Sequence, residues 1–398
     1  CNSADASSTA SCPAAGDWEN IQISGTASSS SFSHTTFRYG GRWFTGINDL
    51  GSLLYIEDAT VPISHAVFEY SQRYGVELVN SDSTIVQSIF RNNNYSDTQA
   101  AGIVIERGAP TVSENAFTDN RYGIRMSSSA TTLTNNTFSS STQEAVVISN
   151  SHGMYSGNVG SNNGVNGILL EGTIGVAGAT TTLYANSLAY VLTSGSIPTI
   201  PASSTVVILP GAVFKGGSGK GLRVLGTLKP AGVLAGDIVF TVMEDDTVAG
   251  DTNNDGASAG TPGAWSGIYV DGGRMEGSGF SVYYGGNFLG GGDDKGGIRV
   301  ERGYLNADNA LFENNYRYGL RLSRATSTIT HTTFRRHNAP GVYSAAALGV
   351  LAYSVLELHD VTFTDNALAV YTDGTASTTS FGLIFSGNTA TSSPADIF

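Results

Sequence analysis

The sequence predicts an all-β solenoid of stacked parallel coils, in which two related modules are joined by a linking β segment. Three observations support this fold class. One long motif occurs twice, phenylalanines recur at intervals near 22 residues, and Gly, Ser, Thr and Asn are abundant throughout the chain. Repeats of roughly 20 to 50 residues are typical of architectures in which each unit packs only on its neighbours.

The longer repeat relates residues 102–126, GIVIERGAPTVSENAFTDNRYGIRM, to residues 297–322, GIRVERGYLNADNALFENNYRYGLRL. Gly-Ile-x-[IV]-Glu-Arg-Gly returns, and after one inserted residue Arg-Tyr-Gly-[IL]-Arg returns as well. The duplication extends upstream, because a Trp precedes a Tyr-Gly-Gly step in both copies, at Trp18 and again at Trp265. Each module therefore begins at a tryptophan.

The shorter repeat has a shared pattern: an apolar residue, four small or polar residues, Phe, a polar turn, then Gly and alternating apolar residues. The phenylalanines are Phe68, Phe90, Phe117 and Phe138 in the first module and Phe312, Phe334, Phe363 and Phe385 in the second. Such a unit holds two or three short strands, which is too little to close a core alone. Stacked parallel coils solve this problem, because each coil bonds to the coils above and below it.

The predicted organisation has four parts. They are an N-terminal segment with a cysteine pair (1–16), a first β-helix module (17–189), linking β coils with an acidic Asp/Asn loop (190–264) and a second β-helix module (265–398). The linking segment contains turn signals at Pro210-Gly211 and Gly216-Gly217, so it is expected to form further β coils. A β-sandwich array is the alternative, but the chain lacks the paired strands with two-residue turns that it requires.

The linking segment also carries a family resemblance. Its runs LPGAVFK, LRVLGTLKPAG, IVFT, GDTNNDG and GAWSGI resemble the coil set that opens right-handed parallel β-helix modules, broadly pectin-lyase-like, in large secreted or surface-anchored bacterial proteins. The resemblance covers most of the chain, from about Trp18 onward. It implies a right-handed parallel β-helix with little or no α-helix. It does not imply one function, because this fold hosts lyases, hydrolases, adhesins and inert stalks.

Charge and composition restrict the partners and the location. The chain has 20 basic and 33 acidic residues, a net charge of −13, whereas nucleic-acid binding needs a basic stripe. A nucleic-acid partner is therefore excluded. No apolar run approaches the roughly 18–20 residues that span a bilayer, so no membrane span is predicted. Two cysteines, few lysines and much Ser, Thr and Asn favour an extracellular or cell-surface protein.

Both cysteines, Cys1 and Cys12, lie in the Ser/Ala-rich N-terminal segment. We predict a disulfide between them, since secreted chains keep such pairs oxidised. The alternative is that Cys1 is the lipid-modified first residue of a bacterial lipoprotein. The residues themselves leave both interpretations open.

One cluster has the pattern of a metal site. The loop Asp251-Thr-Asn253-Asn-Asp255-Gly256 places side-chain oxygens at positions one, three and five and Gly at six, as in the first half of a calcium loop. Position twelve is Pro262, so other oxygens must complete the shell, with Asp245 and Asp246 as the candidates. We predict a structural Ca²⁺ ion here, and a solvated Asx-rich loop is the alternative.

Charged and polar residues elsewhere recur with the scaffold. Polar residues precede the phenylalanines by three positions, at His34, His65, Gln87, Glu114, Asn135 and His331. We interpret them as a solvent-facing ladder at turns rather than a catalytic row. The Glu-Arg pairs at 106–107 and 301–302, and the arginines Arg125 and Arg321, are also duplicated. A unique catalytic constellation would not be copied, so these residues are interpreted as ion pairs or contacts between coils.

Aromatic residues cluster at predicted turns, where flat rings can stack on sugar faces. The binding candidates are Tyr39, Trp43, Tyr284 and Tyr318. The alternative is that these rings cover coil edges and stack on each other.

The leading functional hypothesis is an extracellular structural or adhesive surface protein, with the β-helix as a rod or filament subunit. A carbohydrate-binding module and a polysaccharide lyase or hydrolase are the alternatives. No catalytic residue can be assigned, and enzymatic activity is the less favoured interpretation. Neither terminus shows a capping helix, and the chain ends on Ile397-Phe398. We therefore expect the ends to meet other copies or neighbouring modules of a longer array.

Overall fold

A computed structural model of the chain describes residues 12–25, 30–42, 51–94, 98–193, 195–286, 295–338 and 345–392. These residues form β-strands and turns and no helix, and so none of them belongs to a helix suited to crossing a membrane. All strand pairs are parallel and link successive coils, which confirms the predicted all-β parallel solenoid. The chain divides into two compact units, Cys1–Val147 with Val159–Gly164 and Ile148–Asn158 with Val165–Phe398.

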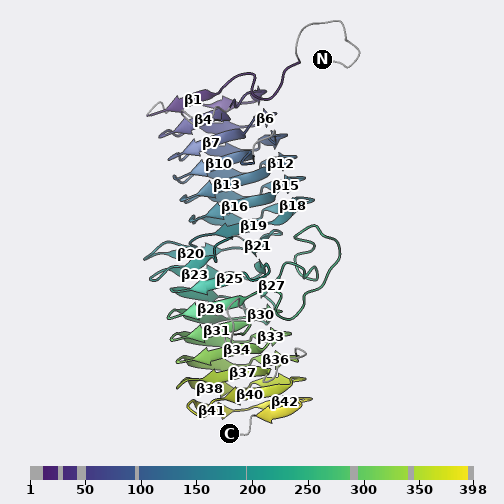
Figure 1. Ribbon diagram of the computed structural model, residues 1–398. Coiled ribbons are helices and arrows are strands. Elements are labelled where there is room, and N and C mark those ends of the chain that lie inside the picture. The colour runs from purple at the N-terminus through teal and green to yellow at the C-terminus, as the bar shows by residue number, and fades with distance from the viewer. Residues whose placement is uncertain are drawn as a thin grey trace. The chain divides into compact units, whose positions relative to one another are not determined.

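In the first unit each complete coil contributes one long strand and two short strands (Figure 1). The β1–β16 sheet contains β1 (Ile21–Ser24), β4 (Ser52–Glu57), β7 (Tyr74–Val79), β10 (Ala101–Glu106), β13 (Tyr122–Ser127) and β16 (Glu144–Ser149). The β2–β14 sheet contains β2 (Phe32–Ser33), β5 (Pro62–Ser64), β8 (Thr84–Val86), β11 (Thr111–Ser113) and β14 (Thr132–Thr134). The β3–β18 sheet contains β3 (Thr36–Arg38), β6 (Val67–Glu69), β9 (Ile89–Arg91), β12 (Ala116–Thr118), β15 (Thr137–Ser139) and β18 (Val159–Ser161).

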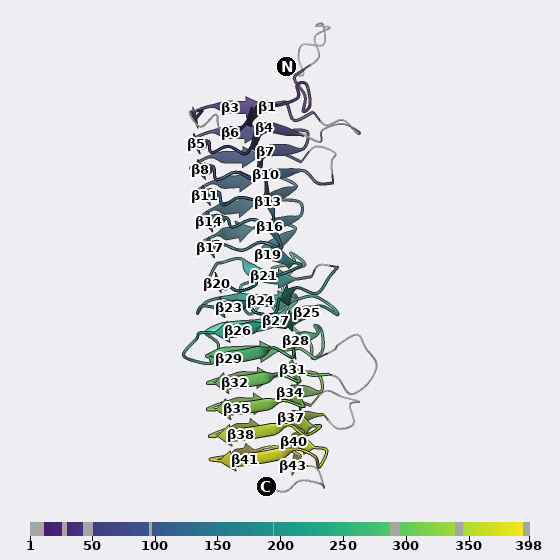
Figure 2. The same ribbon diagram turned by 90° about the vertical axis from the view of Figure 1, so that its left-hand side faces the viewer.

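The second unit also has three sheets, two of which form neighbouring columns in Figure 2. After β17 (Met154–Ser156), the β19–β42 sheet contains β19 (Val165–Glu171), β21 (Ala189–Leu192), β24 (Val213–Gly216), β27 (Ile238–Val242), β30 (Phe280–Tyr283), β33 (Leu311–Glu313), β36 (Thr333–Arg335), β39 (Thr362–Thr364) and β42 (Ile384–Ser386). The β22–β43 sheet contains β22 (Thr199–Ile200), β25 (Gly221–Val224), β28 (Gly267–Asp271), β31 (Ile298–Glu301), β34 (Tyr318–Ser323), β37 (Ala346–Leu351), β40 (Leu368–Thr372) and β43 (Ala390–Ser392). The β20–β41 sheet contains β20 (Thr180–Leu183), β23 (Thr205–Ile208), β26 (Thr227–Pro230), β29 (Arg274–Ser278), β32 (Tyr304–Asp308), β35 (Thr326–Thr330), β38 (Val355–His359) and β41 (Ser377–Phe381).

The repeated phenylalanines stack inside the coils as the sequence predicts. In the first unit the rings of Phe37, Phe68, Phe90, Phe117 and Phe138 follow one another with centroids 4.8 to 4.9 Å apart. In the second unit Phe312, Phe334, Phe363 and Phe385 stack at 4.6 to 5.4 Å. Adjacent parallel strands lie about 4.8 Å apart, so identical residues at one register position are brought into ring contact. The period of the sequence is therefore the period of the core.

The polar residues that precede the phenylalanines lie at coil corners. All six have a positive φ, between 45° and 57°, and all six are exposed. A left-handed residue turns the chain sharply between two short strands. The turn-side ladder predicted from the sequence is confirmed. In the first unit its side chains connect adjacent coils through the stacked rings of His34 and His65 and the hydrogen bond from Gln87 Nε2 to Glu114 Oε2.

His331 is the corner residue with an altered pKa. Its Nδ1 lies 2.8 Å from Asp308 Oδ1, and this hydrogen bond raises the pKa of His331 above its ordinary value of 6.5. The folded state favours the protonated ring, so this stabilisation is present below pH 6.5 and is lost as the pH rises through the folded pKa. We expect Asp308→Asn to lower the His331 pKa in an NMR titration. Asp360→Asn, which removes a contact at 3.9 Å, should lower it less; equal shifts would contradict the assignment.

Buried asparagines form a second ladder that the sequence analysis missed. Asn120 Oδ1 accepts hydrogen bonds from the backbone N–H and the Nδ2 of Asn93 one coil earlier, at 3.2 and 3.0 Å. Asn115 and Asn136 are linked in the same way. Asn120 is fully buried. Its amide satisfies backbone groups at a bend, where no strand pairing is available.

The two copies of the long motif occupy different positions in the coil. Within the second unit, the β19–β42 sheet begins at β19, which contains Gly167-Ile-Leu-Leu-Glu and resembles the motif strand. The same sheet ends with the phenylalanine strands β33, β36, β39 and β42. The motif strand β31 lies instead in the β22–β43 sheet. Two strands usually lie between successive members of this sheet, but only β20 lies between β19 and its partner β21. This coil therefore has one strand fewer, and each later strand of the repeat moves to the next sheet.

Candidate metal centre

The long connection between β27 and β28, residues 243–266, is the most acidic segment of the second unit and is called here the acidic loop. It contains Glu244, Asp245, Asp246, Asp251 and Asp255 and no basic residue. Figure 1 shows the loop projecting from the stacked strands beside β27. Five carboxylates in so short a segment repel one another, and a bound cation would reduce this repulsion.

Hydrogen bonds attach the acidic loop to distant strands of the β19–β42 sheet. The contacts are Asn166 N to the Thr252 carbonyl (2.7 Å), Asn166 Nδ2 to the Asp251 carbonyl (3.1 Å), Lys215 Nζ to the Gly250 carbonyl (2.7 Å) and Gly263 N to the Tyr284 carbonyl (2.8 Å). These partners lie in β19, in β24 and just after β30. The loop therefore crosses the region of the second unit in which the coil order shifts.

Three carboxylates of the loop converge. One oxygen from each of Asp246, Asp251 and Asp255 lies within 4.8 Å of the other two. Ca²⁺ binds oxygens at about 2.3–2.6 Å, so two ligands on opposite sides of one ion are about 5 Å apart. A single calcium ion can therefore contact all three carboxylates with little rearrangement. Among the described residues, this is the only group of three or more His, Cys, Asp or Glu side chains arranged in this way.

Three side-chain oxygens of the acidic loop lack a hydrogen-bond donor among the described residues. They are Asp246 Oδ1, Asn253 Oδ1 and Glu244 Oε2, and all three atoms are buried. A buried polar atom without a partner costs free energy, of the order of 1–3 kcal/mol. A metal ion removes this cost for the oxygens that it contacts. The donor set thus fits a hard cation, because it consists of carboxylate and amide oxygens.

The loop is already shaped by hydrogen bonds of its own. The Asp251 carboxylate accepts from the backbone N–H groups of Asp255 and Gly256, and Asp246 Oδ2 accepts from the Ser258 N–H at 2.6 Å. Asn253 Nδ2 donates to Asp255 Oδ2. Gly256 has a φ of 91°, a conformation that residues with a side chain rarely adopt. The bend predicted at position six of the calcium-like motif is therefore present.

Lys215 is a buried cation that the sequence analysis did not select. Its side chain is fully buried in β24. Burial lowers the pKa of its ammonium group, while the charges of Asp246, Asp245, Asp251 and Glu244 oppose that shift. One lysine offsets only one of five loop carboxylates. Its signal in the sequence is an isolated lysine in the otherwise apolar run Ala-Val-Phe-Lys-Gly.

The structure does not bring every predicted ligand to the group. Asp245 is buried, and its two oxygens accept hydrogen bonds from the hydroxyls of Thr241 (2.6 Å) and Thr247 (2.5 Å). It therefore holds the base of the loop rather than joining the convergent carboxylates. Asp246, Asp251, Asn253 and Asp255 lie together, as the sequence analysis expects.

The predicted sugar-binding aromatics fall into different environments. Tyr318 is only 1% exposed, so the prediction that it presents a ring at the surface is wrong; the strand β34 points it into the core. Tyr39 is half-buried and stacks on Tyr70, with ring centroids 5.4 Å apart. The Tyr284 ring lies against Gly260, where an added Cβ would meet it at 2.2 Å. Trp43 and Cys1 lie outside the described residues, so the Cys1–Cys12 disulfide stays a prediction.

Comparison with known proteins identifies one family. Residues 42–192 match the model of a family described as periplasmic copper-binding protein (NosD), which is less than half of the chain. No curated protein and no solved structure matches this chain. Together with the all-parallel sheets, the match shows a right-handed parallel β-helix repeat protein. The periplasmic description of the family is consistent with an extracellular or envelope-side location.

Proposed function

We propose that this protein is an extracellular or envelope-side structural protein of the kind that forms surface filaments and adhesive stalks. In this proposal its coils continue, end to end, into the coils of another copy or of a neighbouring module. Calcium acts as a structural ion that holds the acidic loop across β19 to β30. The observation that carries the proposal is the apolar surface of the last described coil.

That coil exposes a phenylalanine whose counterpart one coil earlier is buried. Phe385 is 37% exposed, whereas its register partner Phe363 is fully buried. Ile384 and Phe381 in the same coil are 59% and 72% exposed. Exposed strand edges with apolar side chains are templates for pairing with another chain. A further coil of the same pattern would cover the Phe385 ring and pair the strand edges.

End-to-end association predicts a concentration-dependent increase in particle mass at micromolar protein concentration. We expect Phe381→Ser with Ile384→Ser to weaken it, because the change removes apolar area at the last coil. Val233→Ser with Leu234→Ser is the matched control, since these residues are 70% and 67% exposed in a turn after β26. Light scattering and electron microscopy measure the outcome. A strictly monomeric protein, or equal weakening by both variants, would remove the filament proposal.

The alternatives have less support. Copper favours nitrogen and sulfur ligands, whereas the convergent group has only oxygens and lies outside residues 42–192. A calcium-dependent lyase needs a base that reaches the substrate, and Lys215 is fully buried. Release of unsaturated ends from polygalacturonate would favour the lyase over the structural role.

A further inference from the structure

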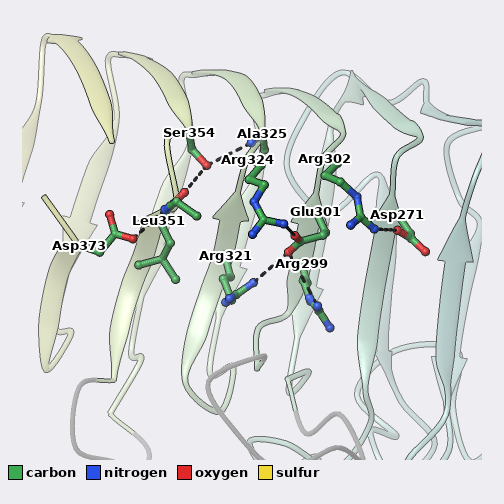
Figure 3. Close-up of polar contacts among 11 residues, drawn as sticks. Asp271, Arg299, Glu301, Arg302, Arg321, Arg324, Ala325, Leu351, Ser354 and Asp373 are labelled. Atoms are coloured by element: carbon green, nitrogen blue, oxygen red, sulfur yellow. Dashed lines mark hydrogen bonds and ion pairs between the residues drawn. The ribbon is translucent and has the colours of Figure 1, made fainter. Parts of the chain in front are cut away.

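One face of the second unit carries positive charge although the whole chain is acidic. It lies on strands β25, β28, β31 and β34 and the corners that follow β31 and β34. Its charged residues are Arg223, Asp271, Arg299, Glu301, Arg302, Arg321 and Arg324, called here the arginine face; Figure 3 shows all of them except Arg223. Five guanidinium groups and two carboxylates leave three positive charges, in a chain of net charge −13.

The two carboxylates are shared among the arginines. Glu301 lies 3.4 Å from Arg324 Nη1, 3.8 Å from Arg321 Nη1 and 3.9 Å from Arg299 Nη2. Asp271 lies 2.5 Å from Arg223 Nη2 and 3.2 Å from Arg302 Nη2. Each carboxylate carries one negative charge, so neither can neutralise all of its partners. On these described strands and corners, positive charges therefore outnumber negative charges by three.

The strand register arranges these charges in a row. Arg223, Tyr269, Arg299 and Arg321 are successive partners across β25, β28, β31 and β34. Neighbouring strands lie about 4.8 Å apart, so the row advances by one strand spacing per coil. The Arg299 guanidinium also lies 4.5 Å from the centre of the Tyr269 ring, which holds it flat against the sheet.

Three of the five guanidinium groups are open to solvent. The side chains of Arg302 and Arg324 are each 60% exposed and that of Arg223 is 44% exposed. Arg299 and Arg321 are largely covered. The exposed groups can contact a ligand directly, while the covered pair adds positive potential beneath them. Arginine forks pair with carboxylate, sulfate or phosphate groups through two parallel hydrogen bonds.

The first unit shows that the coil does not require Arg299 or Arg324. In the duplicated motif, Val104 stands where the second copy has Arg299, and Ser128 stands where it has Arg324. Ser128 and Arg324 have the same corner conformation, with φ of 52° and 51°. Val104 pairs with Glu77, whereas Arg299 pairs with Tyr269. The charges of Arg299 and Arg324 are thus additions to the repeat, whereas Arg302 and Arg321 have counterparts in Arg107 and Arg125.

We propose that the arginine face binds a linear polysaccharide that carries carboxylate groups. Charge complementarity supports this occupant, because anions repeated along a flexible chain can contact forks on successive coils. The net negative charge of the rest of the protein is screened beyond about 8 Å at physiological salt. A nucleic acid carries a far denser charge, about one per 1.7 Å of duplex, and is repelled more strongly by the acidic remainder.

The test uses residues that the first unit already tolerates. Arg299→Val with Arg324→Ser gives the arginine face the side chains found at the matching positions of the first copy. Arg107→Ser with Arg125→Val removes two positive charges from the first unit and is the control with the same net charge. Melting curves of both variants check that they remain folded.

We expect the wild-type protein to bind immobilised polygalacturonate at low salt and not neutral dextran. Hydrogen bonds between charged groups are strong enough that Arg299→Val with Arg324→Ser should weaken binding by about tenfold or more. The control should bind as the wild type does. The affinity of the wild type should also fall with added salt more steeply than that of the arginine-face variant, since fewer charged contacts remain in the variant.

Three results would overturn the proposal. They are no retention of the wild type on polygalacturonate, equal weakening by the two variants, and tighter binding of single-stranded DNA than of polygalacturonate. Equal weakening would show that only the net charge matters. None of these results bears on end-to-end association, which light scattering measures separately.

Discussion

We expect calcium to raise the melting temperature of the wild-type protein and a chelator to lower it. An ion that binds only the folded state stabilises it by about 2.7 kcal/mol when its concentration is roughly 100 times its dissociation constant. The proposed binding group is Asp246, Asp251 and Asp255, of which one oxygen each lies within 4.8 Å of the others. Thermal melts in calcium, in magnesium and in chelator measure the effect. Magnesium should stabilise less, because it demands a stricter octahedral shell.

The double variant Asp251→Asn with Asp255→Asn is expected to change stability in opposite directions with and without calcium. The double variant removes two of the five charges of the acidic loop but keeps an oxygen at each position. We expect it to be more stable than the wild type in chelator, since repulsion is relieved, and less stable than the wild type in calcium.

Asp360→Asn with Asp365→Asn is the control for this variant. It removes the same charge from two corner residues of the second unit, with φ of 54° and 56°, that do not belong to the convergent group. This control should keep the full response to calcium. Coincident melts of the wild type in calcium and chelator would show that the acidic loop binds no ion.

We expect acid to destabilise the protein through one buried histidine. His337 occupies an asparagine position of the buried ladder, between Asn315 and Asn366. Asn366 Oδ1 can only accept, so His337 Nδ1 carries the proton and Nε2 accepts from Asn315 Nδ2. Complete burial lowers the His337 pKa from 6.5 to about 4, partly opposed by the hydrogen bond to Asn366. The folded state thus holds this ring neutral.

The sign of the pH dependence follows from this shift. Between pH 6.5 and about 4 the unfolded chain binds a proton that the folded chain does not. The free energy of unfolding therefore falls as the pH falls through this window, by about 3 kcal/mol in total. Below about pH 4 both states are protonated and this contribution stops changing.

His337→Asn should remove most of this loss. Asparagine is the residue at the neighbouring ladder positions Asn315, Asn366 and Asn388, and it does not titrate. Denaturant unfolding at pH 7 and pH 4.5 measures the difference. We expect the free energy of unfolding of the wild type to fall by about 2 kcal/mol more than that of the variant over this interval. His331→Asn is the control, because its exposed ring has a raised pKa and contributes with the opposite sign. Parallel losses in the wild type and His337→Asn would exclude this histidine as the cause.

The candidate metal group was predictable because its ligands are close in sequence. Asp251, Asn253 and Asp255 alternate along one loop, and the following glycine supplies the bend. The exclusion of Asp245 was not predictable, since it depends on hydroxyls of Thr241 and Thr247 that take both of its oxygens. Neither was the role of Lys215, which is 35 residues from its hydrogen-bond partner Gly250.

The arginine face also combines residues that the sequence identifies with residues that only the fold brings together. Aligning the two copies of the motif reveals that Val104 is replaced by Arg299 and Ser128 by Arg324. It does not reveal that Arg223 joins them, because that residue belongs to the linking segment and meets Asp271 only through the pairing of β25 with β28. Tyr318 misled the sequence analysis for a related reason: a turn motif precedes it, but the strand that begins there points it inward.

The sequence by itself determined the stacking of the coils. A period near 22 residues, with one phenylalanine in each unit, places Phe68 over Phe90 and Phe334 over Phe363, since residues one period apart share a register position. The tertiary structure alone decided which sheet each copy of the motif occupies. The loss of one strand between β19 and β21 shifts the order of all later coils. Backbone hydrogen bonds between parallel strands are the same for any side chain, so only the packed coils select the partner strand.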